Sequence, residues 1–228
     1  MTKLRFTISM SLDGYVAGPD QGLEHPLGKG GEALHEWAFV TRSFRAMHGD
    51  EGGEAGLDDE HVAHGSRGIG ATIMGRNMFG PIRGDWGDET WNGWWGDEPP
   101  FHMPVYVLTH HAREPVEMQG GTTFHFVTDG IESALERAAL DAGERDVLVA
   151  GGASVAQQYL RAGLVDEFDI HVVPTLLGGG TRLFDDLGDA LFGYECTELA
   201  SSPVVAHYTY ARTRTRVRGS DPPPARPE

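Results

Sequence analysis

The stretch from Val147 to Leu160 constrains the fold of this chain more than any other. It consists of a short apolar strand, the pair Gly151-Gly152, and a segment whose apolar residues have helical spacing. Paired glycines let the backbone approach a ligand with no Cβ in the way. A helix that starts there presents N–H groups and the positive end of its dipole, which suit a phosphate. The pattern therefore predicts a nucleotide pyrophosphate site, with a glycine turn that serves packing alone as the alternative.

A second stretch upstream strengthens the nucleotide interpretation. Residues 71–79 form an apolar strand followed by Gly75, Arg76 and Asn77. A cation at a helix N-terminus is unfavourable unless an anion lies beside it, so Arg76 at this junction indicates a charge-assisted contact with phosphate. The alternative for Arg76 is an ordinary solvated side chain.

A third stretch, residues 104–111, is an apolar strand that ends in Thr109, His110 and His111. Two adjacent histidines suggest a metal site at first sight. Neighbouring residues on a strand point to opposite faces, however, and no third ligand lies nearby in the sequence. We therefore expect no metal here.

Composition excludes several classes of function. The 228 residues carry a formal net charge of −16, which argues against a nucleic-acid-binding surface. A single cysteine, Cys196, forms no internal disulfide and fits a reducing compartment. We find neither a secretory signal nor an apolar run of membrane-spanning length, so we expect a cytoplasmic protein without a membrane partner.

Strand and helix patterns alternate along the chain, which predicts an α/β sandwich around a mainly parallel sheet. The predicted segments are strands at 4–10, 168–172 and 204–217, helices at 33–47, 58–66 and 131–142, and a tryptophan-rich loop at 80–100. We expect one domain over residues 1–218 and a disordered proline-rich tail over 219–228.

The order of these motifs resembles the dihydrofolate reductase-like family. The opening strand and turn, Ile8–Gly18, match it, as do Gly163–Glu167 and the run Leu177–Phe184. The resemblance extends to about Arg216 and is closest to the branch of the riboflavin-biosynthesis reductase domain, the C-terminal domain of bifunctional deaminase-reductases. It implies a three-layer α/β/α sandwich with a mainly parallel central sheet and antiparallel C-terminal strands. It also implies a homodimer, for which apolar edge strands near the C-terminus offer an interface.

The resemblance implies NADPH as cofactor and a strained Gly151–Gly152 peptide, with a cis bond as one option. His110, His111 and Arg113 fall where the family holds adenine and the ribose 2′-phosphate. Met10 and Ala17 match positions whose backbone groups receive the nicotinamide carboxamide. The full set of expected cofactor residues is Met10, Ala17, Gly75, Arg76, Asn77, Leu108, Thr109, His110, Gly151, Gly152, Ala153, Ser154, Val155 and Ala156.

Aromatic residues are the best indication of the substrate. The tryptophans offer walls for a planar heterocycle, although core packing explains some of them equally well. His171 alternates along its strand so that it either reaches the same cleft or is a buried core histidine. Asp13 is a turn former or a proton donor, and we favour the turn. The expected substrate residues are Trp37, Trp86, Trp91 and His171, and Asp13 is the candidate catalytic residue.

The chain also departs from its relatives. Dihydrofolate reductase places a carboxylate on its first helix shortly after a tryptophan, and the corresponding position after Trp37 is Arg42. Residues 80–86 lack the acidic, proline-containing stretch that the riboflavin branch uses around its ribose phosphate. We therefore expect an NADPH-dependent reductase that transfers hydride to a C=N or C=O bond of a small pterin- or pyrimidine-like heterocycle. The alternatives are a riboflavin-pathway or dihydrofolate reductase with a divergent pocket, and a non-catalytic NADP-binding protein.

Overall fold

The computed structural model describes residues 2–80, 84–87 and 90–213, except for the side chains of residues 191 and 192. In this part of the chain, nine strands form the main sheet in the order β10-β11-β8-β1-β7-β3-β4-β6-β5, and β2 pairs with β9 in a small second sheet. The strands are β1 Leu4–Ser11, β2 Tyr15–Ala17, β3 Ile69–Gly75, β4 Pro104–Leu108, β5 Val116–Glu117, β6 Thr123–Val127, β7 Asp146–Gly151, β8 Glu167–Val173, β9 Thr181–Arg182, β10 Tyr194–Ser201 and β11 Ala206–Arg212.

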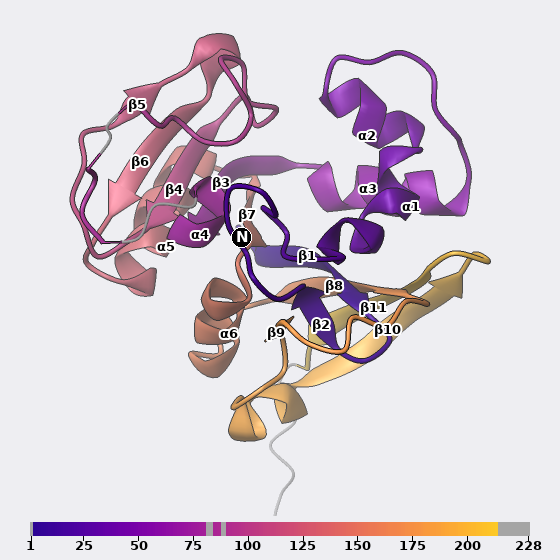
Figure 1. Ribbon diagram of the computed structural model, residues 1–228. Helices are drawn as coiled ribbons and strands as arrows, with labels where there is room; N and C mark the ends of the chain where they lie inside the picture. The colour runs from indigo at the N-terminus through magenta and orange to yellow at the C-terminus, as the bar shows by residue number, and fades with distance from the viewer. Residues whose placement is uncertain (1, 81–83, 88–89, 214–228) are drawn as a thin grey trace, which may run out of the picture.

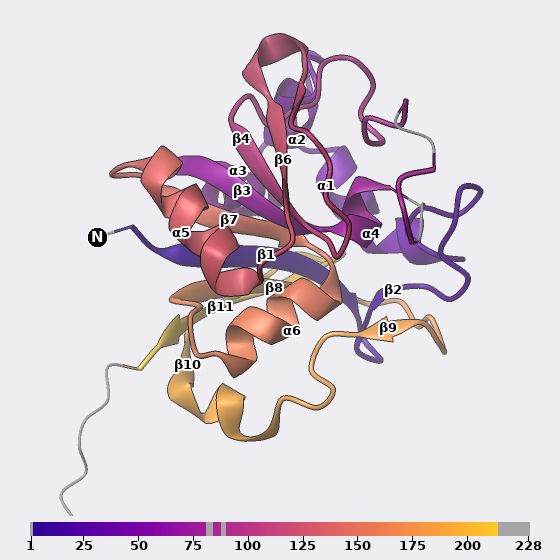
Figure 2. The same cartoon turned by 90° about the vertical axis from the view of Figure 1, so that its left-hand side faces the viewer.

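Within the described residues, six α-helices connect these strands (Figure 1). They are α1 Glu36–Phe39, α2 Arg42–Met47, α3 Leu57–Ser66, α4 Arg76–Phe79, α5 Ile131–Ala142 and α6 Ala153–Arg161, and 3₁₀ segments lie at Gly31–Leu34, Gln119–Gly121 and Gly188–Gly193. Figure 2 shows α5 and α6 over one face of the sheet, with α1, α2 and α3 beyond the other. None of the described helices has the length and apolar character that a bilayer crossing requires.

The sheet is parallel at its centre and antiparallel at its ends. Strands β8, β1, β7, β3, β4 and β6 pair in parallel, whereas β11 pairs antiparallel with β8 and β10 with β11. This confirms the predicted α/β sandwich with antiparallel C-terminal strands. Because the carboxyl ends of parallel strands meet at one edge, the three motifs at the ends of β3, β4 and β7 come together there.

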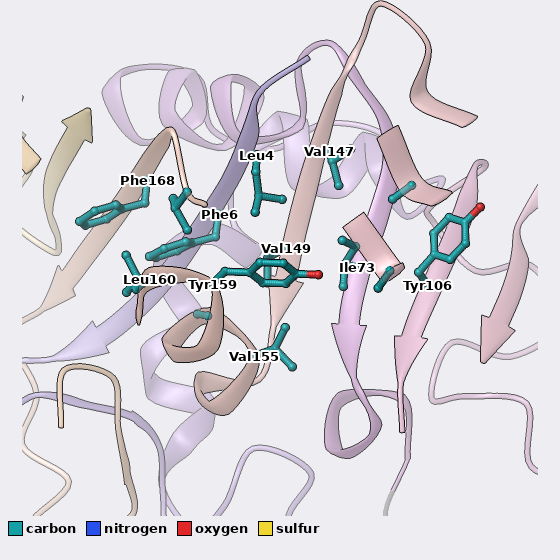
Figure 3. Close-up of a cluster of buried hydrophobic side chains, with 14 of the residues drawn as sticks. Leu4, Phe6, Ile73, Tyr106, Val147, Val149, Val155, Tyr159, Leu160 and Phe168 are labelled. Atoms are coloured by element: carbon teal, nitrogen blue, oxygen red, sulfur yellow. The ribbon is translucent and has the colours of Figure 1, made fainter. Parts of the chain in front are cut away.

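The main apolar core lies between the sheet and helices α5 and α6 (Figure 3). Phe6 of β1 stacks on Phe168 of β8 with ring centroids 4.8 Å apart. Tyr159 of α6 is fully buried and donates its hydroxyl hydrogen to the carbonyl of Ile131 at 2.7 Å, which ties α6 to the start of α5. The even-numbered residues of β1 supply this core, so its odd-numbered residues face the opposite side.

That opposite face of β1 and β8 is polar. Ser9, Ser11, Asp169 and His171 are buried on it, and the side chain of Thr7 is half-buried there. Trp37 of α1 donates its indole hydrogen to Ser9 at 3.1 Å, and Gly65 of α3 lies directly over Thr7. Helices α1 and α3 therefore cover a polar strip of the sheet, which determines the surroundings of several candidate residues.

Two segments differ from the sequence-based expectation. The predicted helix at 33–47 is divided, because Thr41 is extended and its hydroxyl caps α2 by accepting from the N–H of Phe44. The backbone of Glu54 also bonds to Val40 and Arg42, which fills the break between α1 and α2. Strand β11 ends at Arg212, and the predicted tail at 219–228 lies outside the described residues.

Candidate nucleotide site and substrate face

The glycines of two strand ends meet at the carboxyl edge of the sheet. Met74 is in register with Gly151, and a Cβ built on Gly152 would lie 3.7 Å from the Cα of Gly75. Gly151 and Gly152 have φ values of +156° and +87°, which L side chains rarely adopt. No cis peptide bond occurs among the described residues, so the cis option for Gly151–Gly152 is wrong, while strain in this peptide stays a prediction.

Helix α6 begins directly after these glycines. Its first hydrogen bonds run from the N–H groups of Val155 and Ala156 to the carbonyl of Gly152. The N–H groups of Ala153 and Ser154 precede that ladder, and the dipole of α6 makes this end positive. The side chains of Val155 and Ala156 are buried, so only the exposed Ser154 offers a side chain here. The helix begins where the sequence predicted, and anion binding at this end stays a prediction.

Arg76 lies at the neighbouring junction, where β3 ends and α4 begins. Its guanidinium donates to the hydroxyl of Thr109 at 3.0 Å and to the carbonyl of Gly84 at 3.1 Å. It also stacks on the ring of Trp86, 3.2 Å from the centroid. Arg76 thus joins β4 and the tryptophan-rich loop to the glycine junction, while Asn77 beside it is exposed.

The end of β4 is stabilised by the same loop. Trp86 donates its indole hydrogen to the carbonyl of His111 at 2.9 Å, and the His111 ring contacts the carboxylate of Asp85. Arg113 donates to the carbonyl of Trp91 at 2.7 Å, so it holds the loop in place. Leu108 is half-buried, whereas His110 projects into solvent beside the junction.

The first strand and turn contribute backbone and one carboxylate. Met10 is half-buried at the end of β1, and Ala17 is buried in β2, where it pairs with Thr181. Asp13 accepts hydrogen bonds from the Ser11 hydroxyl at 2.6 Å and from the N–H of Gly178 at 2.8 Å. The Ser11 hydroxyl lowers the pKa of Asp13 most, to about 2, so this side chain is ionised at neutral pH. The geometry fits the turn-forming role, and the role of Asp13 as a proton donor stays a prediction.

The structure divides the tryptophans between two sites on the same face of the sheet. Trp86, Trp91 and Trp95 pack against a second apolar cluster over β3, β4 and β6. Trp37 is buried in a third cluster with Val173 and Val205, next to α3. Between the two clusters, central-strand residues Thr7, Leu148 and Ala150 keep partial exposure. The tryptophans expected to form one wall therefore form two.

His171 is a buried core histidine, 4% exposed, and it belongs to a hydrogen-bonded chain that the sequence did not indicate. Its Nε2 contacts the hydroxyl of Thr7 at 2.8 Å, and its Nδ1 lies 2.8 Å from Nδ1 of His207. Nε2 of His207 contacts the carboxylate of Asp58 at 2.9 Å. Burial, followed by the neighbouring histidines, lowers the pKa of His171 well below 6.5.

Metal-binding geometry is absent from the described part of the chain: no group of three or more histidine, cysteine, aspartate or glutamate side chains is arranged to hold an ion. The Nδ1 atoms of His171 and His207 contact each other, so neither of them can bind an ion placed between the two rings.

Comparison with known proteins agrees with this architecture. The family model described as RibD C-terminal domain matches residues 2–204. Two uncharacterised proteins of Bacillus subtilis (strain 168) are similar: YyaP is 36% identical over 95 residues, 40% of this chain and 50% of its own length. YwjB is 29% identical over 87 residues, 38% of this chain and 49% of its own. The matched region spans about half the length of either relative.

Solved structures share the fold. A protein of Shewanella sp. PV-4 described as a riboflavin biosynthesis protein superposes with a TM-score of 0.63 and 21% identity, over 93% of this chain and 100% of that one. The deaminase/5-amino-6-(5-phosphoribosylamino)uracil reductase of Thermotoga maritima gives 0.56 at 14% identity, over 93% of this chain and 57% of that one. Dihydrofolate reductase of Enterococcus faecalis, complexed with NADP(H), gives a TM-score of 0.51 at 14% identity, over 92% of this chain and 96% of that one.

Proposed function

Because the chain belongs to the RibD C-terminal domain family, we propose that it is an NADPH-dependent reductase of a small pyrimidine- or pterin-like heterocycle. Membership of this family supports an oxidoreductase. One observation carries the proposal furthest: the ends of β3 and β7 meet as Gly75 and Gly151-Gly152, α6 starts directly after Gly152 with its Val155 against Gly75, and Arg76 follows Gly75.

The residues present fit a dinucleotide. The Ala153 and Ser154 N–H groups and the positive end of α6 suit a pyrophosphate, and Gly152 keeps that approach open. Arg76 and the exposed His110 suit the phosphate on the adenosine ribose. With a net charge of −16 the chain repels anions at long range, so these local donors provide the attraction. When bound, NADPH supplies the hydride.

The chain's own contribution is orientation and exclusion of water. The two covered regions of the sheet, one under Trp86, Trp91 and Trp95 and the other under Trp37 and α3, flank the half-buried residues Leu148 and Ala150 of β7. A flat heterocycle placed there would lie on β7, whose carboxyl end carries Gly151, one of the residues expected to hold the cofactor. This chain has Arg42 at the position where dihydrofolate reductase has a carboxylate. That difference favours a substrate other than dihydrofolate.

The experiment is a titration of the purified protein with NADPH and with NADH, followed by quenching of tryptophan fluorescence. We expect tighter binding of NADPH, a loss of at least tenfold in Arg76→Gln, and no saturation in Gly152→Val. Arg137→Gln is the matched control, because it removes the same charge from an exposed arginine of α5 that pairs with Asp129.

Two results separate the alternatives. If NADPH binds and is oxidised in the presence of 5-amino-6-(5-phosphoribosylamino)uracil or dihydrofolate, the chain is a reductase of that substrate. If NADPH binds with no turnover of any heterocycle, the non-catalytic alternative holds. Failure to bind either nucleotide at millimolar concentration refutes the proposed function.

A further inference from the structure

Trp86 contacts both arginines that we expect near the cofactor. The guanidinium carbon of Arg76 lies 3.2 Å from the centre of its ring, and that of Arg113 lies 5.0 Å from it. An indole ring attracts a cation over its face through its quadrupole, and tryptophan does so more strongly than the other aromatic side chains. Trp86 therefore interacts with the charges of the nucleotide site, and not only with the apolar cluster around it.

The indole ring of Trp86 is itself fixed by contacts with the sheet and with α4. Its N–H donates to the carbonyl of His111, beyond the end of β4, at 2.9 Å. The ring packs edge-to-face on the buried Phe79 of α4 and on Phe126 of β6, with centroids 5.9 and 5.0 Å apart. A tryptophan side chain has two rotatable torsions, so contacts from three separate elements leave it little freedom. Trp86 is therefore a rigid support for whatever lies on its face.

The Arg76 guanidinium is oriented by this support. Arg76 is half-buried, and besides the ring of Trp86 it contacts the hydroxyl of Thr109 through Nη1 at 3.0 Å and the carbonyl of Gly84 through Nη2 at 3.1 Å. Each of these three partners is uncharged, so together they orient the guanidinium without neutralising it. A solvated arginine occupies many rotamers and loses that freedom when it binds an anion. Arg76 has already lost it, which strengthens binding through preorganisation.

We propose that Trp86 is a positioning residue of the cofactor site. It holds Arg76 in the orientation that binds the phosphate on the adenosine ribose, and it thereby sets the preference for NADPH over NADH. This inference rests on the proposed function. Trp86 acts through the Arg76 guanidinium and needs no contact with the phosphate. Because NADPH and NADH differ only in this phosphate, loss of Trp86 should weaken the binding of NADPH and leave that of NADH unchanged.

A purely structural role for Trp86 has a different consequence. Trp86 also packs in the apolar cluster over β3, β4 and β6, so its loss loosens the residues around it. Such loosening weakens the site for both nucleotides alike, because they share the adenine, the pyrophosphate and the nicotinamide. The ratio of the NADPH and NADH dissociation constants therefore separates positioning of Arg76 from packing.

The test compares Trp86→Leu with Trp95→Leu. Both variants keep an apolar side chain in the same cluster, but the Trp95 ring packs on Phe101 and Phe124, with centroids 4.9 and 6.1 Å apart. Isothermal titration calorimetry gives the dissociation constants, because substitution of a tryptophan changes the fluorescence signal. Trp86→Leu should raise the dissociation constant of NADPH roughly tenfold and leave that of NADH unchanged. Trp95→Leu should keep the wild-type ratio, and Trp86→Phe, which retains a ring next to the guanidinium, should restore most of the preference.

A double-mutant cycle tests whether Trp86 acts through Arg76. In the Arg76→Gln background the guanidinium is gone, so Trp86→Leu should cause no further loss of NADPH affinity. In the Arg137→Gln background, where an exposed arginine on α5 is replaced instead, Trp86→Leu should cause its full loss. Additive losses in the Arg76→Gln background overturn the positioning role.

The remaining outcomes separate this inference from the function on which it rests. A wild type that binds neither nucleotide refutes the proposed function, and the role of Trp86 with it. A wild type that binds NADPH no more tightly than NADH overturns the role of Trp86 alone. So does a Trp86→Leu variant in which the affinities for both nucleotides fall equally or stay unchanged. If Trp86→Leu does not fold, Trp86→Met, which also lacks a ring, takes its place with the same expected results.

Discussion

The packing of β3 against α6 at the glycine junction yields a quantitative prediction. Gly75 has φ −82° and ψ 155°, values that any residue adopts, so Gly75→Ala introduces no backbone strain. Its new Cβ, however, would lie 2.9 Å from Cγ2 of Val155. Carbon atoms prefer about 3.5–4.0 Å, so the Val155 methyl group has to move by roughly 0.6–1.1 Å. Val155 is β-branched and lies in a helix, where one rotamer dominates, so it cannot rotate away.

The expected energies follow from these contacts. Overpacking of this kind costs about 1–3 kcal/mol, offset by about 0.4–1 kcal/mol because alanine restricts the unfolded chain. Val155→Ala alone deletes two buried methyl groups and costs about 2–3 kcal/mol including the cavity. In the Val155→Ala background the clash is gone, so Gly75→Ala becomes neutral or stabilising. The double-mutant cycle should give a coupling of about 1–3 kcal/mol in favour of the double variant.

Urea unfolding of the wild type, both single variants and the double variant measures this coupling. A chain of this length shifts its Tm by about 2–4 °C per kcal/mol, so thermal scans provide an independent check. Additive effects, with a coupling below about 0.5 kcal/mol, would refute the contact between Gly75 and Val155 and with it the geometry of the junction.

Three other perturbations have defined outcomes. Asp13→Asn should lower the Tm at pH 7, because an amide cannot accept all the bonds that lower the pKa of Asp13 to about 2. The Tm of the wild type should exceed that of Asp13→Asn above pH 3.8, and the difference should disappear as the pH falls through about 2. Thermal scans across that pH range detect this change. The pKa of His171 is well below 6.5, so the folded state binds fewer protons than the unfolded state. The free energy of unfolding should therefore fall as the pH drops below 6.5, and urea titrations should show a shallower fall in His171→Gln. Finally, we propose a homodimer through the exposed Leu199, which is paired with Tyr208 on the C-terminal strands. Sedimentation should give twice 24.8 kDa for the wild type and a monomer for Leu199→Glu, and a monomeric wild type would contradict the interface.

The elements that the sequence predicted well are those governed by local rules. The predicted helix at 131–142 is α5 with the same bounds, because its alanines recur at helical spacing and a glycine flanks each end. The strand–Gly-Gly–helix stretch became β7 and α6, with its glycines in the backbone region that favours them. In both cases neighbours within a few positions decide the conformation.

The helix expected at 33–47 shows where local rules fail. Thr41 interrupts the pattern because its hydroxyl caps α2, and because the backbone of the acidic loop at Glu54 pairs with Val40 and Arg42. The apolar spacing on either side is consistent with helix, so periodicity alone did not reveal the break. Contacts with a distant loop provided a better set of hydrogen bonds than a continuous helix.

The sequence by itself determined the α/β class, the glycine junctions and the place of Arg76, because strand-end glycines and period-two alternation carry those properties locally. Only the tertiary structure decided that Trp37 lies apart from Trp86, and that His171 is joined to Thr7 and His207. The contacts of that chain link residues 164, 36 and 149 positions apart, from β1, β8, β11 and α3. The alternation of polar and apolar residues along a strand shows which face of the sheet a polar residue occupies. The partners it meets there depend on strand order and register, which arise from the packing of the whole sheet.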